Sequence, residues 1–409
     1  MKKCVSLFSC AGMGDKGLEA CGIHTIVANE LVESRANLMQ KNFPNTHVII
    51  GDIWEKKNEI IISARNQLQG EQLFCMIISA PCQGASSNGM GRISSEIRKG
   101  KRIKDDPRNR LMIPALEVVN ELKPICVIVE NVPGMRFTQI KNEHDTYESI
   151  LSLMFRSLPS YILRSSVLNT ADYGVPQTRK RLITLAIDAQ HTLEPRILNY
   201  FTEESSVFHP HKTHTTHITL GDCIAHLPAL DAKTRLVDDQ DIFHRIPSWN
   251  DMQYFCMQHT PEDNTAFHNN RCIECKYTTE NSLSIFCEKC NALLPKPVIK
   301  KNESLRLIRA FKTAYRRMAM NRPANALTTN SGVISSDVKG HPLENRVMSL
   351  REIMIIGSIC GYNDVELPWS YDFSNVHDKI IREVIGECIP PMFAYAIGLH
   401  LINIIHESS

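Results

Sequence analysis

The residues best suited to catalysis lie next to three short apolar segments of the sequence. Cys82 comes directly after Pro81 and the run LFCMII. Glu130 ends a second run, ICVIVE. Arg179 and Arg181 occupy alternate positions in QTRKR, just before a third run, so in a strand both side chains would point the same way.

A cysteine in this setting is a candidate nucleophile. The thiolate is the reactive form, and a free thiol with a pKa of about 8.5 is only slightly ionised at neutral pH. A nearby guanidinium would raise the thiolate fraction. A carboxylate at the mouth of an apolar strand, such as Glu130, is easily desolvated, so it could hold or donate a proton near neutral pH. The alternative for Cys82 is a buried core cysteine.

Three further loops carry residues suited to a nucleoside. Gly12 lies in the turn AGMGDKG after the first apolar run, where glycines let a ligand approach the backbone at a helix N-terminus. Glu30 ends the second run and is suited to a ribose diol. Asp52 could accept a hydrogen bond from an adenine amino group while Ile53 packs on the ring. An empty glycine turn and helix-capping acids are the alternatives, but three such loops in succession favour a nucleoside-bearing cofactor.

The elements that must position these residues alternate between strands and helices over roughly the first 190 residues. Short Val- and Ile-rich runs are separated by helical spacing, as at Leu111, Ala115, Val118, Val119 and Leu122. This alternation predicts a parallel sheet covered on both sides, with ligands at the carboxyl ends of its strands. Its loss afterwards indicates a second, smaller domain over 191–375, while 376–409 returns to the first domain, 1–190.

Composition is that of an ordinary globular protein and indicates no partner. Of 409 residues, 43% are hydrophobic and 22% charged, with a net charge of +2, so nucleic acid would have to bind local basic clusters such as 98–104 and 300–322. The start, MKKCVSLFSC, has too short an apolar core for a processed signal. Fourteen cysteines without such a signal indicate a reducing cytoplasm. The uncharged segment 388–406 contains prolines and histidines, which favour a buried helix over a membrane span.

Two Cys-x2-Cys pairs predict a metal site in the second domain. The pairs are Cys272 with Cys275 and Cys287 with Cys290. Four thiolates at this spacing suit a tetrahedral, structural zinc ion. A redox switch or unliganded thiols are the alternatives. The histidines at 209, 211, 214 and 217 have no cysteine or acid beside them and are expected to lie in a linker rather than to bind metal.

In order along nearly the whole chain, these motifs resemble the DNA cytosine-5 methyltransferase family of bacterial restriction-modification systems. The resemblance rests on the first glycine loop, Glu30, GDI, PCQ at 81–83, DPRNRL at 106–111, ENV, QTRKR, RPANALTT at 322–329 and REVIGECIPP at 382–391. It implies a Rossmann-like, AdoMet-dependent methyltransferase domain with a smaller, irregular target-recognition domain. Zinc is not part of the family pattern, so the zinc site rests on cysteine spacing alone.

The resemblance also implies a reaction and a set of roles. In the family a thiolate, here Cys82, attacks carbon 6 of a cytosine flipped out of duplex DNA, while Glu130 interacts with ring nitrogen 3. Arg181 would contact the base carbonyl, and Arg179 would hold the catalytic loop or a phosphate. The other implied substrate-binding residues are Gln83, Asn131 and Gln177. The implied cofactor residues are Phe8, which would stack on adenine, and Gly12, Asn29, Glu30, Asp52, Ile53, Pro81, Leu111 and Glu387.

The chain departs from the family at four positions. Cys10 and Met13 replace glycines of the first loop, Ala80 replaces a proline, and Glu387 replaces an asparagine that helps to hold the cofactor. A glutamate there would place a negative charge near the cofactor's carboxylate unless it points away. Two rival functions remain: a transfer-RNA cytosine-5 methyltransferase, and a non-catalytic DNA-binding protein on a degenerate core. For the DNA methyltransferase we expect a cytoplasmic, nucleoid-associated monomer with no membrane contact, and any cognate restriction endonuclease would act separately.

Overall fold

A central seven-stranded sheet organises the first part of the chain. The computed structural model describes residues 1–81, 107–141, 146–192, 208–302, 304–309 and 313–405. Cys82, Gln83 and the basic run 98–104 therefore lie outside the described residues. The sheet has the order β3-β2-β1-β4-β5-β10-β8. Its strands are β1 (Lys2–Leu7), β2 (Ile23–Glu30), β3 (His47–Ile50), β4 (Cys75–Ile78), β5 (Cys126–Asn131), β8 (Tyr161–Asn169) and β10 (Lys180–Asp188).

The predicted parallel sheet is confirmed for β1 to β5 and is wrong for β10. Strand β10 runs antiparallel to both of its neighbours, β5 and β8. A parallel connection needs a crossover of a dozen or more residues, usually a helix, whereas β8 and β10 are joined only by residues 170–179. That segment holds a 3-10 turn, η3 (Thr170–Tyr173), and a short strand, β9 (Gln177–Thr178).

Helices cover both faces of the sheet, as the sequence predicts. One face packs against α3 (Ile53–Leu68), α5 (Met112–Leu122) and α6 (Ile150–Ser157). The opposite face packs against α1 (Met13–Ala20) and α11 (Pro391–Ile404), and α2 (Glu33–Asn42) follows β2. The expected apolar face of α5 is confirmed, because Ala115, Val118 and Val119 are fully buried. The smaller elements here are β6 (Gln139–Lys141), β7 (Tyr147–Ser149) and the 3-10 turns η1 (Pro107–Leu111), η2 (Pro133–Phe137) and η4 (Ala189–His191).

The apolar C-terminal segment is a core helix of this first part. The most apolar 18-residue window within residues 378–404 has a mean hydropathy of 1.4, and 61% of that window is buried. Helix α11 lies directly on α1: a Cβ added at Gly17 would come within 2.0 Å of the carbonyl oxygen of Pro391. Only glycine permits this close approach. The helix therefore brings the end of the chain back to the sheet.

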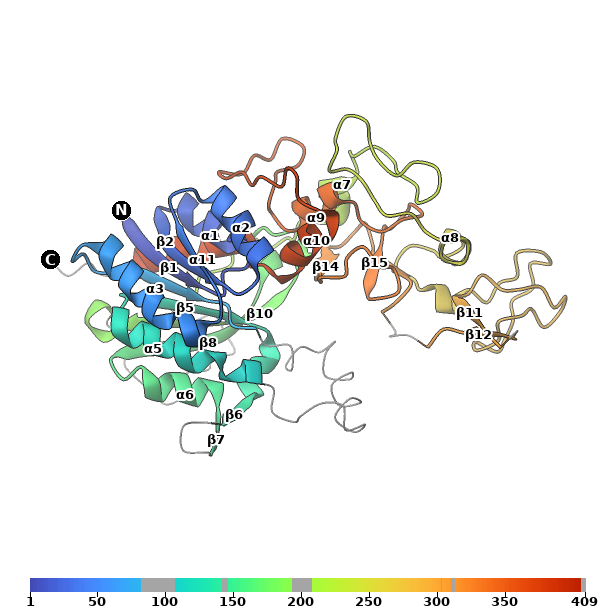
Figure 1. Cartoon of the computed structure of the whole chain (residues 1–409). Coiled ribbons are helices and arrows are strands. Elements are labelled where there is room, and N and C mark those ends of the chain that lie inside the picture. Colours follow the sequence, from blue (N-terminus) through green and yellow to red (C-terminus); the bar gives the residue numbers. More distant parts are fainter. Residues whose placement is uncertain (82–106, 142–145, 193–207, 303, 310–312, 406–409) are drawn as a thin grey trace.

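The rest of the chain consists of short elements and long connections. Figure 1 shows the sheet at one end of the molecule and, at the other, the hairpin formed by β11 (Val298–Lys301) and β12 (Ser304–Leu307). The helices are α7 (Leu220–Ile224), α8 (Asp251–Gln258), the 3-10 turn η5 (Ala266–His268), α9 (Leu350–Ile356) and α10 (Asp378–Glu387). The strands are β11 (Val298–Lys301), β12 (Ser304–Leu307), β13 (Arg316–Arg317), β14 (Ala324–Asn325) and β15 (Val338–Gly340). Pairing of β14 with β9 ties this part to the first part.

Buried charged side chains stabilise the second part of the chain, which has few and short strands. Glu352 is fully buried and accepts from Arg346 Nη1 at 2.7 Å and from Nη2 at 2.8 Å. Arg317 is 3% exposed, and its guanidinium donates to the carbonyl oxygens of Thr260 and Met257, each at 2.7 Å. Arg317 therefore corrects the expectation that the whole basic stretch 300–322 faces nucleic acid. Lys300, Arg306, Arg309 and Arg322 of that stretch are exposed.

The Glu352–Arg346 pair predicts an acid-dependent stability. Burial alone would raise the pKa of Glu352, but Arg346 outweighs burial and lowers the pKa to about 2. An unfolded glutamate titrates at about 4.3, so this stabilisation is complete above that pH and is lost as the pH falls towards 2. We expect Glu352→Gln to lower the free energy of unfolding by about 3 kcal/mol at pH 7, because Arg346 loses its buried partner.

Urea unfolding at pH 7 and at pH 3 checks this. The difference between Glu352→Gln and the wild type should shrink at the lower pH. Glu121→Gln is the matched control, because Glu121 pairs with Arg65 at 2.8 Å with both side chains 56% exposed. An exposed pair contributes at most about 1 kcal/mol. Equal losses for the two variants, or a pH-independent difference, would contradict the role of the buried pair.

Candidate active site

One cavity of about 730 Å³ opens at the carboxyl ends of the strands. Its walls come from the residues that follow β1, β2, β3, β4 and β5, and from the segment between α10 and α11. The structure places eight of the nine expected cofactor residues in its lining: Phe8, Asn29, Glu30, Asp52, Ile53, Pro81, Leu111 and Glu387. Four of the expected catalytic or substrate residues also line it, namely Glu130, Asn131, Arg179 and Arg181.

Gly12 is the expected cofactor residue that does not line the cavity. It caps the N-terminus of α1 with a left-handed φ of 73°. An added Cβ would come within 2.7 Å of the Phe43 ring. Gly12 thus permits the turn and the packing behind it, while Cys10 and Met13 of the same loop line the cavity.

Glu30 joins two of the loops that form the cavity. One carboxylate oxygen accepts from the Cys10 backbone N–H and the other from the Val32 backbone N–H, each at 2.8 Å. The side chain is buried, which raises the pKa of Glu30. Cys10 has a φ of 52°, a left-handed conformation that favours glycine and costs other residues about 1–2 kcal/mol. The first loop therefore keeps a glycine-like backbone at Cys10.

Asn29 and Asp52, two of the residues expected to bind the cofactor, also bind neighbouring backbone. Asn29 donates to the carbonyl oxygens of Ile49 at 3.0 Å and Gly51 at 3.1 Å, which fixes the loop before α3. Asp52 accepts from the Trp54 backbone N–H at 2.9 Å and so caps α3. Asp52 is therefore a helix cap, as one interpretation expects. It also lines the cavity, as a cofactor-binding residue must.

Glu130 and Arg181 form an ion pair at the cavity wall. Arg181 Nε lies 2.7 Å from Glu130 Oε1, with 15% and 9% of the two side chains exposed. The pairing follows from the sheet register, because Ile183 of β10 lies opposite Glu130 and Arg181 is two residues along on the same face. Sequence reasoning placed the two residues near each other but missed their direct contact.

Asn131 binds the segment that follows β4. Its side-chain amide donates to the carbonyl oxygen of Ala80 at 2.8 Å, and its own oxygen accepts from the Val132 backbone N–H. Pro81 lines the cavity. The described chain thus enters the cavity one residue before Cys82.

Two of the expected site residues bind other parts of the protein. Arg179 is 2% exposed and donates from Nη1 to the carbonyl oxygens of Leu327 and Gly386, each at 3.0 Å. Burial, with Arg181 nearby, lowers the pKa of Arg179 to about 10, so it stays charged at neutral pH. Gln177 does not line the cavity. Its amide bonds to the Ile356 carbonyl oxygen at 3.3 Å and to the Leu327 N–H at 3.1 Å.

Sequence reasoning missed Arg35, Trp54 and Arg108, which also line the cavity. Arg35 Nη1 lies 2.7 Å from Glu387 Oε2. The glutamate that departs from the family pattern therefore faces the cavity, paired with a cation. Arg35 lies in the first turn of α2, five residues after Glu30, and no local motif marks it as a site residue.

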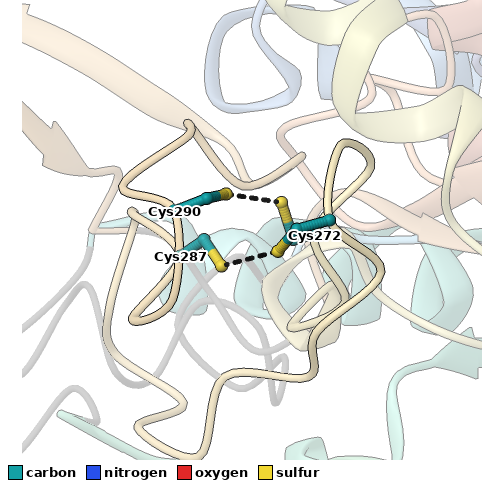
Figure 2. Close-up of side chains that lie close together, drawn as sticks. Cys272, Cys287 and Cys290 are labelled. Carbon is teal, nitrogen blue, oxygen red and sulfur yellow. Dashed lines mark hydrogen bonds between the residues drawn. The ribbon is translucent and has the colours of Figure 1, made fainter.

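The cysteines of the second part form one cluster. The sulfur atoms of Cys272 and Cys290 lie 3.5 Å apart, as do those of Cys275 and Cys287. Figure 2 shows Cys272 on one loop and Cys287 and Cys290 on another, with their side chains pointing towards one another. All four sulfur atoms lie within 4.8 Å of one another, and within the described ranges this is the group able to hold a metal ion.

Each cysteine pair closes a similar turn. The Cys272 N–H donates to the Tyr277 carbonyl oxygen and the Cys287 N–H to the Ala292 carbonyl oxygen, each at 2.8 Å. The histidines of 209–217 are bound elsewhere: His209 is buried against the Ile183 carbonyl oxygen and His217 pairs with Asp172. No metal group in the described part of the chain includes them.

Comparisons with known proteins show the family of the chain and agree with its fold. The family model for C-5 cytosine-specific DNA methylases matches residues 2–403. The Type II methyltransferase M1.HgaI of Avibacterium volantium is 29% identical over 410 residues, covering 98% of both sequences. The Type II methyltransferase M1.HphI of Haemophilus parahaemolyticus is 25% identical, covering 96% of this chain and 85% of the relative.

Solved structures share the fold. A prophage-encoded DNA modification methyltransferase of E. coli superposes with a TM-score of 0.58 at 18% identity, covering 99% of both chains. A mutant of Spodoptera frugiperda DNMT2 superposes with a TM-score of 0.58 at 13% identity, covering 98% of this chain and 100% of the other. At these identities the likeness concerns the fold alone. The match of the family model over almost the entire length shows that the chain belongs to the C-5 cytosine-specific DNA methylases.

Proposed function

We propose that this protein transfers a methyl group from AdoMet to carbon 5 of a flipped-out cytosine in a specific duplex DNA sequence, through a covalent bond to Cys82. The reaction class is that of the family. The observation that carries the proposal is the shared cavity: a nucleoside-type pocket with Glu30 and Asp52 is continuous with the Glu130–Arg181 pair. The chain enters it one residue before Cys82.

The cavity residues suit AdoMet chemically. Phe8 and Ile53 offer apolar surface to adenine, Asp52 an acceptor to its amino group, and Glu30 a buried carboxylate to the ribose diol. Bound AdoMet would supply an electrophilic methyl group. Nothing in the lining blocks the space, because Cys10 and Met13, larger than the usual glycines, still leave about 730 Å³.

The proposed roles of the protein groups follow from their positions. The Cys82 thiolate adds to carbon 6, which makes carbon 5 nucleophilic. Glu130 holds a proton at ring nitrogen 3, where charge develops, and Arg181 both orients Glu130 and contacts the base carbonyl. After methyl transfer, loss of the carbon 5 proton and elimination of the thiol release the product. Arg179 acts at a distance, by holding residues 327 and 386 around the site.

The second part of the chain is proposed to read DNA. Its β11–β12 hairpin exposes Lys300 and Arg306, and Arg309 follows it. A two-stranded ribbon of this kind fits the DNA major groove, and its cations suit phosphates. We place the protein in the cytoplasm as a monomer on the nucleoid, and propose that any cognate restriction endonuclease acts separately.

The proposed reaction is tested by offering methyl-labelled AdoMet with unmethylated genomic DNA and bulk tRNA in parallel. We expect label in DNA, none with Cys82→Ala, and a loss of roughly 100-fold or more with Glu130→Gln, the range for a proton-handling group. Cys21→Ala is the control, because Cys21 is half-buried against α11 and does not line the cavity. Label in tRNA alone would move the substrate to RNA. Label in neither would favour a degenerate, DNA-binding core.

We also propose that the four clustered cysteines bind one structural zinc ion. Tetrahedral zinc with bonds of about 2.3 Å to sulfur separates its sulfur ligands by about 3.8 Å, close to the two distances of 3.5 Å. The apolar cluster of this module has Cys272, Cys287 and Leu294 as its buried members. A core this small needs an additional cross-link, such as a bound metal ion, to be stable.

Zinc content and protease sensitivity check this proposal. We expect one zinc ion per chain, and expect Cys272→Ser to lose it and to become cleavable between 268 and 297, since zinc binding in such modules is folding energy. The variant should still bind S-adenosylhomocysteine in the distant cavity. Cys360→Ser, a half-buried thiol outside the cluster, should change neither property. Full protease resistance in protein purified free of zinc would overturn the assignment.

A further inference from the structure

The cavity contains a second ion pair that the proposed chemistry does not use. Arg35 of α2 and Glu387 at the end of α10 come from distant parts of the chain and meet at 2.7 Å, with 19% and 35% of their side chains exposed. Both line the cavity. Burial alone would lower the pKa of Arg35, but Cys10, Glu387 and Glu30 raise it. The cavity wall therefore presents a fixed cation and an anion side by side.

The other charged groups of the lining already have partners. Glu30 accepts two backbone N–H groups, Asp52 caps α3, and Glu130 pairs with Arg181. Asp15 accepts from the hydroxyls of Ser6 and Thr25. Among the described residues, Glu387 is the hydrogen-bonding partner of the Arg35 guanidinium. A guanidinium carries five donors, so Arg35 keeps donors for a ligand.

We propose that Arg35 and Glu387 together bind the α-amino-acid end of the cofactor, with Arg35 taking the carboxylate and Glu387 the ammonium group. This inference rests on the proposed use of AdoMet and extends it to a subsite. The ligand end is a zwitterion, so it matches a cation and an anion held next to each other. Glu387 alone would repel the carboxylate, whereas Arg35 offsets the charge of Glu387 and offers the carboxylate a cation.

The pair has a defined place in the reaction. The methyl donor and its demethylated product carry the same amino-acid end, so this subsite binds both equally. The amino-acid end is also unchanged in the transition state, so the subsite binds ground state and transition state equally. Binding of this kind affects KM and leaves the rate of the chemical step unchanged. Arg35 and Glu387 are thus binding residues, and loss of either should weaken cofactor affinity at nearly constant kcat.

Calorimetry with trimmed ligands tests the assignment without DNA. The ligands are S-adenosylhomocysteine, its analogue without the carboxylate, its analogue without the amino group, and methylthioadenosine, which lacks both. We expect Arg35→Gln to weaken S-adenosylhomocysteine about 10- to 100-fold, the value of a charge-assisted hydrogen bond. The same variant should bind the analogue without the carboxylate as the wild type does. Glu387→Gln should show the reciprocal pattern with the analogue that lacks the amino group.

Two controls separate a binding role from a structural one. Arg65→Gln removes an arginine from an exposed pair on α3 that does not line the cavity, and should change no affinity. Methylthioadenosine should bind all variants alike, which shows that each variant is folded at the adenosine end. Equal weakening of every ligand by Arg35→Gln, or no weakening at all, would overturn the subsite. Failure of the wild type to bind S-adenosylhomocysteine would instead overturn the proposed function on which it rests.

Discussion

The contact between α1 and α11 is the constraint on which the completed site depends. The helices approach so closely at Gly17 that the Pro391 carbonyl oxygen occupies the space of a side chain. This contact fixes the start of α11, and the end of α10, a few residues earlier, supplies Gly386 and Glu387 to the cavity. Arg179, directly before β10, then holds the Gly386 carbonyl oxygen. Residues from the two ends of the chain, such as Phe8 and Glu387, thus line the same cavity. They do so because α1 and α11 pack with no side chain between them at Gly17.

The second part of the chain is joined to this core by polar interactions more than by sheet. Gln177 and Arg179 both bind Leu327, and β14 adds a strand to β9 beside them. Beyond that contact, buried ions such as Arg346 with Glu352 take the place that strand pairing has in the core. Breaking such a network is costly, so a part of the chain built on long connections can still have a definite shape.

Much of the core was predictable from the sequence, because β1 to β5 are apolar runs and their carboxyl ends must meet at one edge. That rule alone gathered Glu30, Asp52 and Glu130 into one cavity. Strand β8 escaped prediction, since Arg164, Ser165 and Ser166 interrupt its apolar pattern although all three are buried. The direction of β10 depends on a connection too short for a crossover.

Side chains whose partners lie far along the chain were also beyond sequence reasoning. Arg317 reads as a surface cation in a basic stretch, yet its guanidinium is buried among backbone carbonyls. Gln177 sits within a catalytic motif and binds the second part of the chain instead. Arg35 belongs to no recognisable motif, because its proposed role depends on an ion pair with Glu387, some 350 residues away.

The central claim is that the methyl group is delivered to carbon 5 of cytosine, and the identity of the modified base tests it most directly. Genomic DNA from cells that express the protein, digested to nucleosides and analysed by mass spectrometry with chromatographic standards, reports which atom is methylated. The account predicts 5-methylcytosine, and none of it in cells that express Cys82→Ala. A product methylated on an exocyclic nitrogen, either N4-methylcytosine or N6-methyladenine, would contradict it, because neither reaction needs a thiolate addition to carbon 6.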